Sequence, residues 1–268
     1  MSSERFQRQN FLGAHSEERL GQCRVGIVGL GGGGSHIAQQ LAHIGVGGFV
    51  LVDEDVVEET NLNRLVGATA ADALNASKKV EVAMRLIRGV NPAANITPLP
   101  QQWEAAPDAL RDCDVIFGCV DGYAERDQLE RLTRRFLIPY IDIGMDVHEF
   151  AGQFLITGQA ALSLPGRPCL WCMGLLTQAL LERERSEYGR AGHRPQVIWP
   201  NGILASTAVG MFMQLVTPWH KAPASHMLLE YDGNTQTVIA SNKLVILAQK
   251  TCKHFSPGDV GDPFFSNT

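Results

Sequence analysis

A glycine-rich turn near the start of the chain restricts its fold more than any other feature. The stretch GLGGGGSH, residues 29–36, follows the β-branched run Arg24–Val28 and leads into the amphipathic segment Ser35–Ile44. Glycines between a strand and a helix allow a tight turn and let backbone N–H groups face an anion. The stretch therefore predicts the first strand-to-helix turn of a nucleotide-binding α/β sheet.

The same turn fits the dinucleotide fingerprint G-x-G-x-x-G. Gly29, Gly31 and Gly34 occupy its glycine positions, and Asp53 follows at about the distance expected of a ribose-binding carboxylate. Gly32 lies in the same turn and is a further candidate for contact with a nucleotide. Such turns serve NAD, FAD, SAM and ATP alike, so the glycines indicate a nucleotide without saying which one.

Short β-branched runs alternate with amphipathic stretches through the first half of the chain, which is typical of parallel strands joined by helices. This pattern predicts an α/β fold with a doubly wound, Rossmann-like, mostly parallel sheet in residues 1–150. Its ligands would lie at the carboxyl ends of the strands. The expected strands are Arg24–Val28, Phe49–Val52, one near Ile96, Asp114–Cys119 and Tyr140–Ile143. The expected helices are Ser35–Ile44, Ser77–Val90 and Glu125–Phe136.

The pattern changes from about Ala151, so we expect residues 151–268 to form a smaller part with antiparallel strands. Gly152–Thr157 is typical of one strand, and a hairpin is expected from Met227–Tyr231 and Thr235–Ala240. Leu204–Val216 is expected to be a buried helix. The charged segment Glu182–Gln196 has little apolar content, which favours an exposed or mobile crossing segment.

Charge and apolar content exclude several classes of partner. The chain has 23 Lys plus Arg against 28 Asp plus Glu, a net charge of -5, so no broad cationic surface is expected for nucleic acid or anionic lipid. The N-terminus lacks an apolar signal core, and the longest apolar run, Gly202–Val216, is short for a membrane span. These features favour a cytoplasmic protein with no membrane contact.

Polar residues after the second strand narrow the choice of nucleotide. In VDEDVVEETNLNR, Asp53 is placed for ribose hydroxyls, Asp55 follows it, and Asn61 and Arg64 would face phosphates. Lys79 opens the next helix, where a cation is unfavourable against the helix dipole unless an anion binds there.

Asp121 directly follows the fourth strand, in FGCVDGYAERD. A carboxylate at this edge, beside a triphosphate, would hold Mg²⁺. Aspartate is also a good N-cap for the helix that follows. The two roles are compatible with each other.

These motifs, in this order, resemble the ThiF/MoeB/HesA adenylyltransferases, whose nucleotide-binding core is shared with ubiquitin-activating enzymes. The resemblance runs from Arg5 to about Cys172 and adds RFQRQ and CVDGYAERDQL to the motifs above. It implies that Asp53 binds ribose, that Asn61, Arg64 and Lys79 bind phosphates, and that Asp121 binds Mg²⁺. Arg8 would reach the ATP of a partner subunit, which requires a homodimer.

The implied activity is ATP-dependent adenylation of a C-terminal carboxylate. The partner would be a small ubiquitin-like or sulfur-carrier protein, or a peptide, with a free C-terminus. Such an enzyme joins the carboxylate to the α-phosphorus of ATP and releases pyrophosphate. A carboxylate is already ionised at pH 7, so the sequence need not supply a general base.

Cys169 and Cys172 have the spacing of half a tetrahedral zinc site. The resembling family commonly completes this site with a second C-x-x-C, but here that region reads TCKHF, and Cys252 with His254 is the substitute we predict. Free thiols or a redox pair are the alternatives. Zinc binding by three cysteines would leave only Cys23, Cys113 and Cys119, which are expected in or beside the core. We therefore expect no thioester cysteine.

Two other functions fit parts of the pattern. One is an NAD-dependent Rossmann oxidoreductase, in which Asn61, Arg64 and Lys79 would have no function. The other is a catalytically silent, dimeric binding module of the same fold. The joint presence of candidate phosphate and metal ligands favours Mg·ATP over both.

Overall fold

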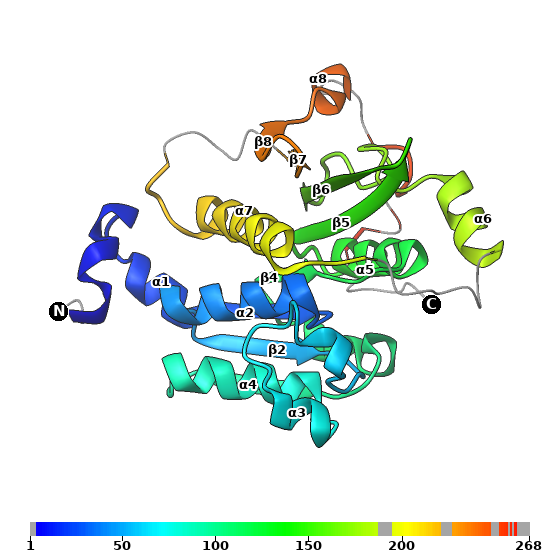
Figure 1. Cartoon of the computed structure of the whole chain (residues 1–268). Coiled ribbons are helices and arrows are strands. Elements are labelled where there is room, and N and C mark those ends of the chain that lie inside the picture. The colour runs from blue at the N-terminus through cyan, green and yellow to red at the C-terminus, as the bar shows by residue number, and fades with distance from the viewer. Residues whose placement is uncertain are drawn as a thin grey trace, which may run out of the picture.

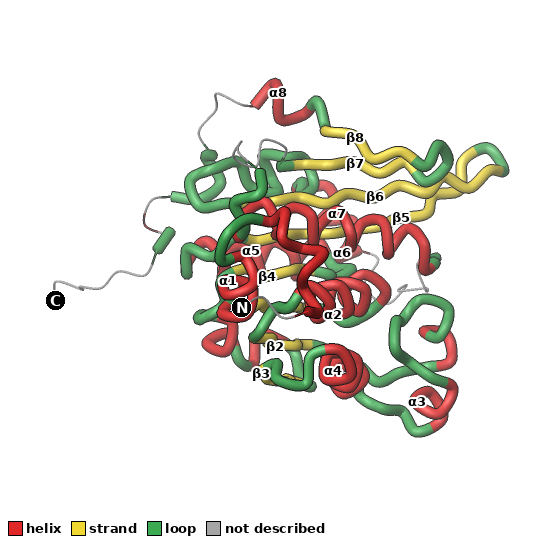
Figure 2. The backbone as a smooth tube through the Cα atoms, turned by 90° about the vertical axis from the view of Figure 1, so that its left-hand side faces the viewer, coloured by secondary structure: helices red, strands yellow, loops and turns green. Residues whose placement is uncertain are grey.

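A single eight-stranded sheet organises the chain (Figure 2). The computed structural model describes residues 4–186, 195–220, 227–247, 252–256, 258 and 260–261. Within them the strand order is β3-β2-β1-β4-β5-β6-β7-β8. The strands are β1 Arg24–Val28, β2 Gly48–Val52, β3 Asn95–Leu99, β4 Val115–Gly118, β5 Tyr140–Phe150, β6 Gln153–Ser163, β7 Leu228–Asp232 and β8 Thr237–Ala240.

Five neighbouring strands, β3 to β5 in the sheet order, pair in parallel, and β5 to β8 pair antiparallel. After β1 the chain forms β2 and β3 on one side of that strand. It then crosses to the other side of β1, where it forms β4. This reversal between β1 and β4 is the switch point at which a doubly wound sheet binds ligands. The expected fold class, including the antiparallel C-terminal strands, is confirmed.

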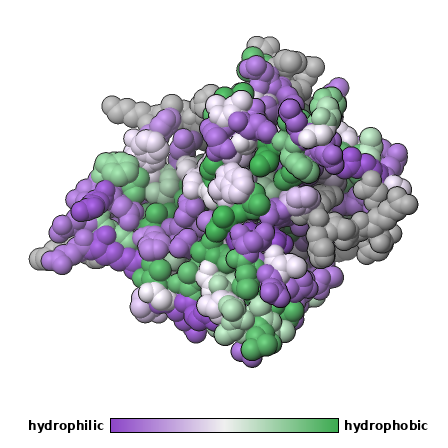
Figure 3. All heavy atoms as spheres, in the orientation of Figure 1, coloured by the Kyte–Doolittle hydropathy of each residue, from purple (hydrophilic) through white to green (hydrophobic). Residues whose placement is uncertain are grey.

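Helices cover both faces of the sheet (Figure 1). The α-helices are α1 Ser16–Gln22, α2 Gly32–Ile44, α3 Ala70–Leu74, α4 Lys79–Val90, α5 Tyr123–Arg135, α6 Gln178–Ser186, α7 Ile198–Val216 and α8 Lys243–Leu247. The 3₁₀ helices are η1 Glu4–Leu12, η2 Glu59–Asn61, η3 Trp103–Ala105 and η4 Pro107–Leu110. The N-terminal segment η1 lies to the left in Figures 1 and 3, where hydrophilic residues predominate on its surface.

Alternation of side chains along the strands builds two cores. Phe49 and Leu51 of β2 pack with helices α2, α4 and α7, whereas Val50 and Val52 face the opposite side with α5 and η4. The same alternation holds in β4, where Phe117 joins the first core and Ile116 the second. Burial on both faces explains why these strands read as continuous apolar runs.

Several elements are longer than the sequence pattern predicts. β5 continues past Ile143 to Phe150 because it pairs over its whole length with β6. α7 begins at Ile198 rather than Leu204, and α2 begins at Gly32 rather than Ser35. Glycines and a proline in these first turns hide the helical periodicity in the sequence.

The predicted crossing segment is partly helical. Residues up to Ser186 belong to α6, which the sequence pattern did not predict, but Glu182, Arg183, Arg185 and Ser186 are exposed as expected. Residues 187–194 lie outside the described part of the chain, and residues 195–197 lead into α7. None of the described helices is both long and apolar enough to cross a membrane.

Gly34 is required for packing of α2 on the sheet. A Cβ atom at this position would lie 1.9 Å from the carbonyl oxygen of Gly29, a backbone atom that cannot move aside. We predict that Gly34→Ala destabilises the fold by about 3 kcal/mol or more, as expected for a severe overpacking. Urea unfolding measures the change. Gly89→Ala in α4 is the matched control, since a Cβ there meets nothing within 4 Å and should leave stability unchanged or slightly higher.

Candidate functional site

A cavity of about 290 Å³ opens at the carboxyl ends of β1, β2 and β4. Its size is at the lower end of the range for small-molecule sites. The polar and charged side chains on its wall are Asp53, Glu54, Asp55, Arg64, Lys79, Gln101, Gln102, Asp121, Glu125, Arg126, Gln196 and Asn201. Eight of the residues predicted to bind nucleotide or magnesium therefore line this one cavity: Gly29, Gly31, Gly32, Asp53, Asp55, Arg64, Lys79 and Asp121.

The glycine turn forms the floor of the cavity through residues 29 and 31–33. A Cβ atom on Gly31 would have no neighbour within 4 Å, whereas one on Gly32 would lie 2.5 Å from Nδ2 of Asn201. A Cβ on Gly33 would lie 2.5 Å from Cδ1 of Ile143. A larger residue at 32 or 33 would therefore have to displace the side chain of Asn201 in α7 or Ile143 in β5, whereas at 31 the backbone is open.

Two predicted residues do not reach the cavity wall. Gly34 packs against Gly29 as described above and does not line the cavity, so its predicted contact with nucleotide remains a prediction. Asn61 is 8% exposed and its Oδ1 accepts a hydrogen bond from the Glu58 backbone at 3.1 Å. This interaction caps η2. Asn61 thus shapes the loop that carries Arg64, and its predicted contact with phosphate remains a prediction.

Asp53 connects two loops that border the cavity. Its Oδ2 accepts a hydrogen bond from the backbone of Leu30 at 2.6 Å, and its Oδ1 accepts one from the backbone of Asp55 at 2.9 Å. Burial raises the pKa of Asp53, and the nearby Lys79 ammonium opposes this rise. Both carboxyl oxygens retain lone pairs for the hydroxyl groups of a ribose.

Lys79 and Arg64 bring positive charge to the same cavity. Nζ of Lys79 lies 2.7 Å from Oδ2 of Asp55 and 3.9 Å from Oδ1 of Asp53. Arg64 donates from one guanidinium nitrogen to the carbonyl of Thr60 and to the side chain of Asn63. Its remaining N–H groups are available to an anion.

Asp121 lies at the mouth of the cavity, where its Oδ1 accepts a hydrogen bond from Gln196 at 3.2 Å. It is not the N-cap of α5, because Gly122 occupies that position. The carboxylate of Glu184 in α6 instead accepts hydrogen bonds from the backbones of Tyr123 and Ala124, both at 2.8 Å. Glu184, rather than Asp121, therefore supplies the side-chain cap at the start of α5.

Arg126 is a cavity residue that the sequence pattern missed. Its guanidinium donates to Asp142 at 3.1 Å, to the carbonyl of Val120 at 3.1 Å and to the carbonyl of Ile143 at 3.3 Å. Asp142 is fully buried and also accepts a hydrogen bond from the hydroxyl of Tyr140. Burial raises the pKa of Asp142, and the Arg126 guanidinium opposes that rise. This buried pair fixes the loop that carries Asp121.

Glu125 is the second residue that was missed. It lies in the first turn of α5 on the cavity wall. Burial, together with the carboxylates of Glu104, Asp121 and Asp53, raises its pKa to about 7. A carboxyl group that changes charge near neutral pH on the wall of this cavity makes both stability and the binding of a charged ligand sensitive to pH.

Replacing Glu125 with Gln should remove the part of the pH dependence of stability that this carboxyl group causes. A raised pKa in an acid means that its contribution is fully present below the unfolded pKa, about 4.3, and is lost as pH rises through about 7. We therefore predict that Glu125→Gln is more stable than the wild type at pH 8 and closer to it at pH 4.5. Urea unfolding at the two pH values tests this. An equal difference at both values would contradict a raised pKa.

Arg8 lies in η1 on the exposed surface and does not line the cavity of its own chain. Its predicted contact with ATP requires a second subunit and therefore remains a prediction.

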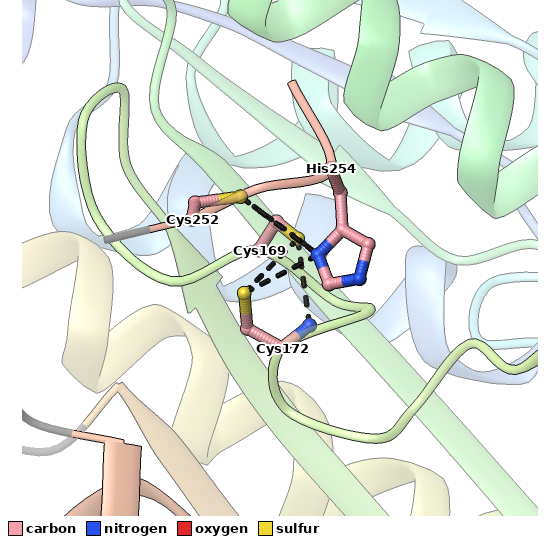
Figure 4. Close-up of side chains that lie close together, drawn as sticks. All are labelled: Cys169, Cys172, Cys252 and His254. Carbon is pink, nitrogen blue, oxygen red and sulfur yellow. Dashed lines mark hydrogen bonds between the residues drawn. The ribbon is translucent and has the colours of Figure 1, made fainter. Parts of the chain in front are cut away.

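A second group of functional side chains comes together from two distant segments (Figure 4). Cys169, Cys172, Cys252 and His254 place three sulfur atoms and one ring nitrogen within 4.8 Å of one another. Nδ1 of His254 lies 3.3 Å from Sγ of Cys169 and 3.4 Å from Sγ of Cys172. Sγ of Cys169 lies 3.6 Å from that of Cys172 and 3.5 Å from that of Cys252.

This arrangement fits a tetrahedral metal ion. Sulfur ligands about 2.3 Å from a central zinc ion would lie roughly 3.8 Å apart, close to the distances above. Three thiolates with one imidazole are also a donor set that zinc prefers. The four residues predicted to bind zinc thus form a candidate metal site, and the tight C-x-H spacing does not keep His254 from it.

The other cysteines are poor nucleophiles. Burial raises the pKa of Cys23 to about 11 and that of Cys113 to about 12. Cys119 lines the nucleotide cavity rather than lying wholly in the core, and burial raises its pKa as well. None of the three has an environment that would stabilise a thiolate.

Comparison with known proteins identifies the family. A SAMP-activating enzyme E1 from Haloferax volcanii is 33% identical over 164 residues, which are 60% of this chain and 57% of that protein. The molybdopterin-synthase adenylyltransferase of Escherichia coli is 29% identical over 221 residues, 82% of each chain. The match to the first of these proteins spans little more than half of that protein's length.

The fold has close counterparts among solved structures. The structure of E. coli MccB with ATP superposes with a TM-score of 0.73 at 20% sequence identity, covering 90% of this chain and 72% of that one. The sequence model of the ThiF family matches residues 4–254. Because this match covers nearly the whole chain, the protein is a member of the ThiF family.

Proposed function

We propose that this protein is an ATP-dependent adenylyltransferase that activates a C-terminal carboxylate as an acyl-adenylate. The observation that carries the proposal is the convergence of the glycine turn, Asp53, Arg64, Lys79 and Asp121 on one cavity. The names of the two relatives, a SAMP-activating enzyme and a molybdopterin-synthase adenylyltransferase, support the same chemistry. They give no support to the NAD-dependent oxidoreductase.

The proposal gives each side chain on the wall a role. Asp53 would bind the ribose, the open backbone at Gly31 would face phosphate, and Arg64 and Lys79 would bind the phosphate oxygens. Residues 1–150 would supply this ATP-binding part, and residues 151–268 would supply the substrate-binding and metal-binding part. Arg126 would hold the loop before α5 in place.

Catalysis would consist of positioning and charge neutralisation. The attacking carboxylate needs no base, but it must approach a triphosphate of the same charge. At about 4 Å from a single phosphate charge the repulsion is roughly 4 kcal/mol at an effective dielectric constant near 20. Arg64, Lys79 and the partner's Arg8 would offset this repulsion and stabilise the pyrophosphate that leaves.

The oxygen ligands at the cavity mouth suit Mg²⁺, which prefers carboxylates and phosphate oxygens. Asp121 would hold the ion, which when bound would neutralise charge on the phosphates. The Cys₃His cluster would hold zinc in a structural role, because its four protein ligands occupy all the positions of tetrahedral coordination. With these cysteines bound to metal, the acyl-adenylate would pass directly to an acceptor without a thioester.

The proposed partner is a small ubiquitin-like or sulfur-carrier protein, or a peptide, with a free C-terminus. We also propose a homodimer, since Arg8 can contribute only to the site of another subunit. Arg8→Ala chains can be mixed with chains that keep Arg8 but are inactive at their own site. Activity should return in the mixed dimers, because the inactive chain supplies Arg8 to the intact site of its partner.

ATP–pyrophosphate exchange tests the proposal. Carrier proteins and peptides that end in glycine are added to the purified chain with magnesium and labelled pyrophosphate. Exchange that depends on the added C-terminus is the expected result. Absence of exchange with every partner, while ATP still binds, would favour the silent binding module.

A further inference from the structure

The nitrogen ligand of the Cys₃His cluster lacks the usual support of a metal-bound histidine. Such a histidine normally donates its second ring N–H to a carboxylate, a carbonyl or a water molecule. Among the residues that the structure describes, none accepts a hydrogen bond from Nε2 of His254. His254 is an exposed ligand, so water can accept from Nε2, but mobile water does not fix the direction of the ring as a protein contact can.

That contact comes from Trp171, which lies between Cys169 and Cys172 in the sequence. The indole stacks on the imidazole of His254, with ring centroids 5.8 Å apart and planes inclined by 25°. Stacking in this geometry restricts rotation of the imidazole about its side-chain bonds. It leaves Nδ1 directed at the sulfur atoms (Figure 4).

Trp171 is itself held by α5. Its Nε1 donates a hydrogen bond to Oδ1 of Asp127 at 2.6 Å, and Oδ2 of Asp127 accepts from Nε of Arg131 at 3.0 Å. Helix α5 is itself fixed to this segment, because Glu130, one residue before Arg131, is fully buried and accepts hydrogen bonds from the backbone of Leu170 at 3.1 Å.

The chain on the other side of the imidazole is anchored to the same helix. Phe255, the residue after His254, is 8% exposed and lies under the guanidinium groups of Arg134 and Arg131, at 4.7 and 5.5 Å. Phe255 occupies the position at which a second C-x-x-C would have its second cysteine. Its burial against α5 holds the backbone next to His254 in place.

We propose that Trp171 and Asp127 are positioning residues that orient His254 as the nitrogen ligand of the metal site. This inference rests on the metal site of the proposed function but is independent of adenylation. Outer partners of metal ligands commonly change metal affinity by about 10- to 100-fold. An effect of that order is expected here when the indole is removed.

Metal titration of the full chain tests the proposal. Zinc affinity is measured by competition with a chelator, and cobalt(II) absorption reports tetrahedral sulfur and nitrogen coordination. Trp171→Leu should weaken zinc binding by about 10-fold or more, Asp127→Ala by a smaller factor, and Trp171→Phe least, since a ring remains to stack. Gln128→Ala, an exposed neighbour on the same helix, should bind like the wild type.

The His254→Ala background separates positioning from folding. Without the imidazole, Trp171→Leu should cause no additional loss of metal affinity, whereas a general weakening of the fold would lower affinity in both backgrounds. Equal losses in the two backgrounds, or unchanged affinity of Trp171→Leu, would overturn the proposal. A wild-type chain that binds neither zinc nor cobalt would overturn it as well. Pyrophosphate exchange, measured separately, shows whether adenylation fails for another reason.

Discussion

Lys79→Ala is expected to reduce ATP–pyrophosphate exchange by about a hundred- to a thousand-fold, the usual effect of removing one group that stabilises transition-state charge. Lys79 lines the cavity, and its ammonium is held within 3.9 Å of the carboxylates of Asp53 and Asp55. The two acids place the cation before ATP binds, so its position costs no reorganisation during the reaction.

Lys78→Ala is the matched control. Lys78 is the N-cap of the same helix, but its Nζ donates to the backbone carbonyl of Glu54 and it does not line the cavity. Exchange by this variant should stay near the wild-type rate. If both variants lose activity equally, the loss comes from a disturbed start of α4 rather than from the missing charge of Lys79. In that case Lys79→Arg, which restores the charge, should recover no exchange. Full activity of Lys79→Ala would exclude the proposed phosphate contact.

The sequence predicted the strands well where burial is complete. β1 was predicted at its observed bounds, and β2 differs by one residue, because strands covered on both faces need unbroken β-branched and aromatic runs. Helix starts were predicted less well. α2 and α7 begin with glycine or proline in their first turns, where local propensity opposes a helix that tertiary packing nonetheless stabilises.

Site residues were predictable where they follow strand ends. Asp53 comes directly after β2 and Asp121 is the third residue after β4, and parallel strands place their carboxyl ends at one edge. Arg126 and Glu125 were missed because they belong to a helix whose charged residues all look solvent-exposed in sequence. The signal available for Arg126 was the buried Asp142 on β5, an acid inside an apolar run that required a cationic partner.

The metal site, in contrast, could not be predicted from the positions of its residues along the chain. Its two halves are more than 80 residues apart, as the contact between Cys169 and His254 shows, and no spacing rule could establish that they meet. The prediction came from family resemblance and the chemistry of available donors. The structure adds Trp171 and Asp127, which no zinc-ligand pattern contains.

Asp142→Asn is expected to destabilise the protein by about 3–5 kcal/mol, because it leaves the Arg126 guanidinium buried without a counter-charge. The arginine side chain is only 8% exposed and Asp142 is fully buried, so neither water nor a neighbouring acid can replace the lost carboxylate without movement of α5. Urea unfolding gives the change. Glu230→Gln is the control, since its pair with Lys243 is 36% and 53% exposed and its loss should cost about 1 kcal/mol or less.

Replacing both partners separates stability from function at this pair. Arg126→Met combined with Asp142→Leu removes the two charges together, and apolar side chains of similar volume commonly restore the stability lost by breaking a buried pair. The double variant should therefore be more stable than Asp142→Asn. Its exchange activity should nevertheless stay low, because Arg126 also donates to the carbonyl of Val120, the residue before Asp121. Recovery of stability together with full exchange would show that the buried pair serves only the fold, and that Asp121 needs no support from Arg126.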